Sequence, residues 1–196
     1  MVNTINYPDY AVYLRDTGYP PEPAQVFIHV PDAENLLRQG LAHFTGGHAV
    51  WDEQNYRPIV NWLTDNHGRG LLLMGENGLG KTLIGLRILP VLIHYAHKKV
   101  VRCFRAQEMC STPDIVLASH ISYIDDVGTE SISNVFGNRR VPFAELCDIA
   151  EIRGKLLIIS TNCDIPHLRE KYGDRTVDRL RAITTPVLFT GKSHRI

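Results

Sequence analysis

Apolar positions follow two different rhythms along the chain. Residues 31–44 and 52–66 place apolar side chains three and four positions apart, which predicts two amphipathic helices, the second ending at a glycine cap at Gly68. After residue 70 short apolar runs alternate with helical patterns. The predicted strands are residues 71–74, 100–104, 121–124, 156–161 and 187–190, and the predicted helices are 82–97, with a kink at Pro90, 141–151 and 176–183.

This alternation predicts an α/β fold with a five-stranded parallel sheet flanked by helices. Residues 1–30 show little periodicity and contain a cluster of prolines at positions 20, 21 and 23, so we expect an arm or an extended segment there.

Composition agrees with a globular protein. The 196 residues are 44% hydrophobic and 21% charged, and Lys plus Arg equals Asp plus Glu at 21 each, so overall charge gives no support for a nucleic-acid partner. No apolar stretch is long enough to span a bilayer, and residues 1–10 lack a signal-peptide pattern, so we expect a cytoplasmic protein. None of the four cysteines forms a Cys-x-x-Cys pair, which favours reduced thiols over a zinc site.

A complete phosphate-binding motif follows the first predicted strand. The motif G-x-x-x-x-G-K-[ST] is formed by Gly75, Glu76, Asn77, Gly78, Leu79, Gly80, Lys81 and Thr82. Its glycines let backbone N–H groups approach an anion, and the helix that begins near Lys81 adds the positive end of its dipole. We expect Lys81 to contact the β- and γ-phosphates of ATP and the Thr82 hydroxyl to bind Mg²⁺.

Two acids come directly after the strand at residues 121–124. In parallel sheets ligands bind at the carboxyl ends of the strands, so we expect Asp125 to hold Mg²⁺ and Asp126 to polarise the attacking water as general base. Glu130 is a nearby alternative base. Asn162 follows the strand at 156–161 and is expected to orient water or to touch the γ-phosphate. No guanine-reading Asn-Lys-x-Asp motif follows, which favours ATP over GTP.

These motifs, in this order, resemble the DnaC and IstB-like helicase-loader branch of the AAA+ ATPases. The resemblance covers residues 51–196, and its most specific part is Tyr-Gly-Asp-Arg at residues 172–175 followed by Asp-Arg-Leu-Arg at 178–181. Further matching segments are residues 59–63, 69–72, 124–130, 159–162 and 193–195. The resemblance implies an AAA+ ATPase domain at residues 51–196 and leaves residues 1–50 as an N-terminal arm and helix, a candidate partner-binding segment. In a departure from the family's pattern, we expect no full helical lid after the last predicted strand.

The resemblance also implies a shared ATP site in an oligomer. An arginine from the neighbouring subunit completes such a site, a role that motif position gives to Arg179, with Arg175 as the alternative. Arg195 resembles the second sensor arginine, which acts on its own subunit's nucleotide.

The implied function is a replicative helicase loader that binds and slowly hydrolyses ATP. An IstB-like transposition helper shares all these motifs. A nucleotide-gated interaction module with negligible turnover is a further alternative, because Asp126 stands where many such ATPases carry Glu. The implied partners are a replicative helicase and single-stranded DNA. Candidate DNA-contacting residues are Arg102, Arg105, Arg139 and Arg140, with Phe104 and Phe136 as the nearest aromatics.

Overall fold

A parallel five-stranded sheet forms the centre of the molecule. The computed structural model describes residues 15–18, 24–130, 133–135 and 138–191. The strands lie in the order β2-β3-β6-β1-β7, and every neighbouring pair is parallel. Their bounds are β1 Gly70–Met74, β2 Arg102–Arg105, β3 Ile121–Val127, β6 Leu156–Thr161 and β7 Thr184–Leu188. The predicted fold class is therefore confirmed.

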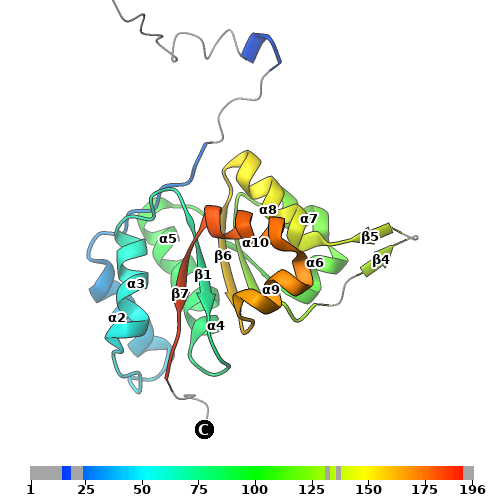
Figure 1. Ribbon diagram of the computed structural model, residues 1–196. Coiled ribbons are helices and arrows are strands. Elements are labelled where there is room, and N and C mark those ends of the chain that lie inside the picture. Colours follow the sequence, from blue (N-terminus) through cyan, green and yellow to red (C-terminus); the bar gives the residue numbers. More distant parts are fainter. Residues whose placement is uncertain (1–14, 19–23, 131–132, 136–137, 192–196) are drawn as a thin grey trace, which may run out of the picture.

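Helices cover both faces of this sheet (Figure 1). One layer contains α2 Ala33–Phe44, α3 Glu53–Thr64, α4 Lys81–Leu83 and α5 Leu89–His97; the other contains α6 Ala106–Ser111, α7 Pro113–Ala118, α8 Pro142–Arg153, α9 Ile165–Tyr172 and α10 Asp174–Ile183. Because side chains alternate along a strand, Leu71 and Leu73 of β1 enter one core and Leu72 enters the other. A separate hairpin of β4 Ser133–Val135 and β5 Asn138–Arg140 projects outward past α6 and α7 (Figure 1).

The helix after the phosphate loop is interrupted. A π-helical turn, η1 Ile84–Ile88, separates α4 from α5. The irregularity predicted at Pro90 therefore lies earlier, and Pro90 itself stands in the first turn of α5. Pro90 has no N–H for the carbonyl four residues before it, which agrees with irregular hydrogen bonding inside η1.

The second helix also ends differently from the prediction. It stops at Thr64 with Asp65 at its C-cap, so Gly68 is not a helix cap but part of the turn into β1, where its φ is 71°. At the other end the Asp52 carboxylate accepts hydrogen bonds from the N–H groups of Gln54 and Asn55. This N-cap fixes where α3 begins.

Residues 24–30 belong to the core. This stretch is extended, and Val26, Ile28 and Val30 are buried while the residues between them are exposed. Asn66 holds it in place: its Oδ1 accepts from Ile28 N–H at 2.8 Å, and its Nδ2 donates to the Val26 carbonyl at 3.0 Å. The end of the predicted arm is therefore packed against the domain.

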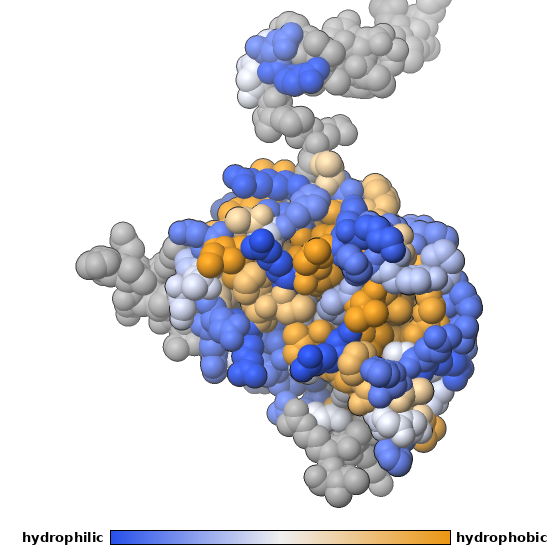
Figure 2. All heavy atoms as spheres, turned by 180° about the vertical axis from the view of Figure 1, so that it is seen from behind, coloured by the Kyte–Doolittle hydropathy of each residue, from blue (hydrophilic) through white to orange (hydrophobic). Residues whose placement is uncertain are grey.

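The surface leaves several large apolar side chains exposed. Among these are Val91, Tyr95 and Val100, on α5 or between it and β2. Figure 2, which shows the molecule from behind, displays apolar residues gathered across the middle of that face with hydrophilic residues around them. Apolar surface of this kind is typical of regions that contact another molecule.

Candidate functional site

The phosphate loop joins β1 to α4 and depends on its glycines. Gly75, Gly78 and Gly80 have φ values of 135°, 85° and 91°, a region that side chains with a Cβ rarely adopt. A Cβ on Gly75 would also lie 2.4 Å from the carbonyl oxygen of Phe189, just past β7. The loop therefore keeps its shape only with glycine at these positions.

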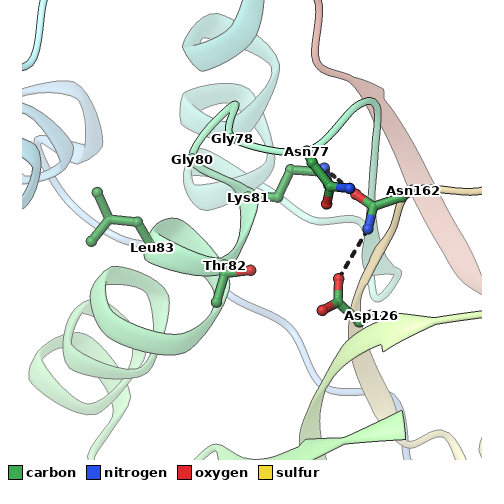
Figure 3. Close-up of a pocket in the computed structure, with 8 residues that line it drawn as sticks. All are labelled: Asn77, Gly78, Gly80, Lys81, Thr82, Leu83, Asp126 and Asn162. Carbon is green, nitrogen blue, oxygen red and sulfur yellow. Dashed lines mark hydrogen bonds between the residues drawn. The ribbon is translucent and has the colours of Figure 1, made fainter. Parts of the chain in front are cut away.

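A cavity of about 230 Å³ opens beside this loop (Figure 3). Its lining brings together the three sequence segments predicted to form the site: Asn77, Gly78, Gly80, Lys81, Thr82, Leu83, Asp126 and Asn162. The other three motif residues do not line it. Leu79 is buried in the core, and Gly75 and Glu76 contribute carbonyl oxygens to Lys81.

Lys81 links the loop to the tip of β6. Its Nζ donates to the carbonyls of Gly75 at 2.8 Å and Glu76 at 2.7 Å, and to Asn162 Oδ1 at 2.9 Å. Only 5% of this residue is exposed, so these bonds compensate the burial of its charge. An anion that entered the cavity would compete with the same acceptors for the ammonium group.

Asp125 and Thr82 form a cluster of oxygen ligands at the inner side of the loop. The Thr82 hydroxyl donates to Asp125 Oδ1 at 3.0 Å, and Asp125 is 8% exposed. A hydroxyl beside a carboxylate is a donor set that suits Mg²⁺. Tyr123 and Ser160 also donate to Asp125 Oδ1. Burial and the neighbouring Asp125 raise the pKa of Tyr123, so its hydroxyl is a neutral donor.

Asp126 faces the cavity because β3 is irregular there. The strand continues to Val127 instead of ending at residue 124, with a bulge between Ile124 and Val127. Asp126 adopts a left-handed backbone with φ of 56°. Its Oδ1 accepts from Asn162 Nδ2 at 3.2 Å, so a hydrogen-bonded line runs from Lys81 through Asn162 to Asp126 (Figure 3).

Glu130 does not line the cavity. It is 5% exposed, and its Oε2 accepts from the N–H of Gly128 at 2.9 Å while its Oε1 accepts from the hydroxyl of Tyr172. Lys171 donates to the Gly128 carbonyl at 2.6 Å. These bonds tie the loop after β3 to the end of α9, so Glu130 has a structural role and Asp126 is the acid at the cavity.

The three arginines singled out by the resemblance are placed differently from one another. Arg179 is held on α10 by two acids of α8: its Nε donates to Glu151 at 2.8 Å and a terminal nitrogen donates to Asp148. Arg175 is exposed in the first turn of α10, and its side chain makes no hydrogen bond or ion pair with any described residue. Neither lines the cavity, and Arg195 lies outside the described residues.

A second, mostly apolar cavity of about 430 Å³ adjoins the first, and no sequence motif pointed to it. Gly80 and Leu83 line both cavities, and the remaining lining residues are Leu41, Thr45, His48, Ala49, Val50 and Tyr56. The Thr45 hydroxyl donates to the Leu41 carbonyl and accepts from Ala49 N–H, which shapes the loop between α2 and α3. These residues match no known sequence motif and come from separate segments of the chain, so no local pattern could have identified them.

The candidate DNA-contacting arginines belong to two different strands, β2 and β5. Arg102 and Arg105 are exposed at the two ends of β2, whereas Phe104 packs against a core. Arg139 and Arg140 belong to β5, and Phe136 lies outside the described residues. In the part of the chain that is described, no helix is long and apolar enough to cross a membrane, and no cluster of His, Cys, Asp and Glu is suited to a metal ion.

Comparison with known proteins shows similarity in structure only. No protein-family model and no curated protein matches the sequence. The chain superposes on the DnaC helicase loader with a TM-score of 0.52 at 16% identity, covering 83% of this chain and 93% of that one. DnaI gives 0.53 at 17%, covering 84% and 85%, and AMPPCP-bound DnaA from Aquifex aeolicus gives 0.51 at 15%, covering 74% and 50%. The chain thus shares its fold with the DnaC helicase loader, DnaI and DnaA.

Proposed function

We propose that this protein binds ATP with Mg²⁺ and hydrolyses it slowly, at a site completed by a second subunit. The observation that carries the proposal is the hydrogen-bonded line Lys81–Asn162–Asp126 across the phosphate-loop cavity. A cation, a polar amide and an acid at one cavity are the groups that ATP hydrolysis needs.

The phosphates would lie against the loop. Lys81 would exchange its carbonyl acceptors for the β- and γ-phosphate oxygens, with backbone N–H groups of the loop completing the cradle. Thr82 and Asp125 would hold Mg²⁺, which supplies charge neutralisation for the phosphates when it is bound. The adjoining apolar cavity would take the adenine base, because it shares Gly80 and Leu83 with the phosphate site and offers contacts for a flat ring.

Asp126 would act as the general base and Asn162 would orient the attacking water. Asp is one methylene shorter than Glu, so the carboxylate reaches less far into the cavity, and this motivates slow turnover. The same feature supports the alternative of a nucleotide-gated binding module. Tight ATP binding with no turnover under any condition would favour that alternative.

An arginine of α10 would be supplied to the neighbouring subunit's site. Motif position assigns this role to Arg179, but Arg179 would first have to leave Asp148 and Glu151. Arg175 is exposed and has no partner among the described residues, so contacts favour Arg175. Arg195 is the proposed second sensor arginine.

At the level of the cell, we infer a DNA-replication accessory ATPase that acts on a replicative helicase, with residues 1–50 as a candidate partner-binding segment. The support is the fold shared with the DnaC helicase loader and with DnaA. Single-stranded DNA is a candidate second partner. An IstB-like transposition helper would share the same site, and ATP-dependent filaments on duplex DNA would favour it.

The testing experiment is ATP turnover by the full chain over a range of protein concentrations, alone, with single-stranded DNA, and with a replicative helicase. Specific activity should rise with protein concentration, because the site is shared, and rise further with DNA or helicase. ATP turnover that is independent of protein concentration would contradict a shared site. No nucleotide-dependent association with a helicase would contradict the loader role.

A further inference from the structure

Three hydroxyl groups converge on one carboxylate oxygen beneath the phosphate loop. Asp125 Oδ1 lies 2.5 Å from the Tyr123 hydroxyl, 2.5 Å from Ser160 Oγ and 3.0 Å from Thr82 Oγ1. A carboxylate oxygen offers about two lone-pair positions, so Oδ1 is fully used. With Oδ1 held in this way, the second oxygen of Asp125 has a fixed direction.

The Tyr123 ring occupies space that is left by a glycine in the neighbouring helix. It lies two residues before Asp125 on β3, so both side chains point to the same face of the sheet. Its ring is fully buried against Gly85 of the π-helical turn, where an added Cβ would come within 2.1 Å of the ring. A residue without a side chain at position 85, in a widened helical turn, thus gives the ring its place beside the loop that carries Thr82.

Ser160 connects the two acids of the site. Its hydroxyl donates to Asp125 Oδ1 and accepts from the backbone N–H of Asp126 at 3.0 Å. Ser160 comes from β6, the neighbouring strand, and is fully buried. It therefore fixes the Asp125 side chain and the bulged backbone of Asp126 at the same time.

We propose that Tyr123 and Ser160 are positioning residues for the metal: they orient the Asp125 carboxylate so that Mg²⁺, arriving with the nucleotide at Thr82, meets a ligand already in place. This inference rests on the proposed ATP site. Residues that hold a metal ligand by hydrogen bonds contribute to metal affinity without touching the metal, and losing one weakens binding by about 10- to 100-fold. Phenylalanine at position 123 would preserve the packing against Gly85 and remove only the donor.

The test measures nucleotide affinity by titration calorimetry with Mg²⁺ and again in EDTA, using the full chain. Wild type should bind ATP more tightly with Mg²⁺. Tyr123→Phe should keep the wild-type ATP affinity in EDTA. The increase in ATP affinity that Mg²⁺ provides should be about tenfold smaller than in wild type. Ser160→Ala should show the same selective loss, which gives a second route if one variant folds poorly. A general loosening of the fold would instead lower affinity in both conditions.

Tyr172→Phe is the matched control. It removes another buried tyrosine hydroxyl that donates to a carboxylate, that of Glu130, away from the cavity. Its Mg²⁺-dependent gain should equal that of wild type. The inference is overturned if Tyr123→Phe and Ser160→Ala keep the full gain, or if Tyr172→Phe loses as much. A wild type that gains nothing from Mg²⁺ would instead refute the proposed function on which the inference rests.

Discussion

The phosphate-loop cavity and the first turns of α10 differ in how firmly their functional side chains are held. Lys81, which lines the cavity, is held by two carbonyls and Asn162, and Asp125, beneath the loop and outside the cavity lining, is held by three hydroxyls. On α10, Arg175 projects into solvent without a partner among the described residues, and Arg179 is bound to acids of α8.

This difference indicates which parts of the proposed ATP site are already in place within one chain and which part is missing. The groups proposed to bind phosphate and Mg²⁺ are already held in place by other parts of the chain, and such preorganisation is what lets polar groups stabilise a transition state. The positive charge that would face the γ-phosphate from the other side is not at the cavity, since no arginine lines it in the described structure. Under the proposed function, one subunit would hold the binding site, and α10 would be the surface that it offers to the next subunit.

Removing the exposed arginine should have the largest effect. We expect Arg175→Ala to bind ATP as wild type does and to lose turnover by about a thousandfold, the usual effect of an arginine acting on the γ-phosphate. Arg179→Ala, the matched control on the same helix, should lower thermal stability through its lost ion pairs and retain more activity. The measurements are steady-state turnover and thermal unfolding. If Arg179→Ala instead lost more turnover than Arg175→Ala, the ion pairs of Arg179 would have to open when subunits assemble.

Mixing variants tests whether the arginine acts between subunits. Arg175→Ala keeps an intact phosphate loop, and Lys81→Ala keeps an intact α10, so a mixture should regain part of the activity that each lacks alone. A mixture as inactive as its components would contradict an arginine supplied by the neighbour.

The acid at the cavity should have the next largest effect. Asp126→Asn should keep nucleotide binding and reduce turnover by at least about a hundredfold, because an amide cannot accept the proton of the attacking water. Glu130→Gln is the matched control: it should lower the unfolding temperature, since Glu130 is buried and bonded to Tyr172, and change turnover much less. Turnover retained in Asp126→Asn but lost in Glu130→Gln would move the base to Glu130.

Loss of the loop cation should affect binding itself. Lys81→Ala should weaken ATP binding by roughly a hundredfold, the loss expected when charge-assisted bonds to phosphate are removed. Lys98→Ala, which removes an exposed lysine just after α5, should bind ATP as wild type does. The measurement is equilibrium binding of a fluorescent ATP analogue, and equal affinity for Lys81→Ala and wild type would refute the phosphate-loop assignment.

The sequence predicted the parts of the site that are encoded locally. The phosphate loop after β1, the two acids near the end of β3 and Asn162 after β6 all stand at the carboxyl ends of apolar strands, and parallel strands bring those ends to one edge. The sequence could not decide whether Asp126 or Glu130 is the general base. Their positions alone do not show that Glu130 is bonded to Tyr172 and Gly128.

Features that depend on tertiary contacts were not predictable. Tyr123 looks like an ordinary strand residue until β3 lies beside Gly85 and the loop that carries Thr82. Residues 24–30 were expected to belong to an arm or an extended segment; they are extended, but the sequence did not show that they pack into the core and that Asn66, some forty residues away, bonds to their backbone. The short helices α6, α7 and α9 also escaped prediction, since six to eight residues carry little periodic signal.

A change in the second cavity, where the adenine base is proposed to bind, should have the smallest effect on ATP affinity. Val50 lines it and is 81% exposed, so Val50→Asp should leave the fold intact and place a negative charge where an apolar ring is proposed to bind. We expect ATP affinity to fall about tenfold, through desolvation of the carboxylate and repulsion of the phosphates. Val100→Asp, at a position 70% exposed and outside both cavities, is the matched control and should bind as wild type does. If both variants bind ATP as tightly as wild type while Lys81→Ala does not, the phosphates lie at the loop and the base lies elsewhere.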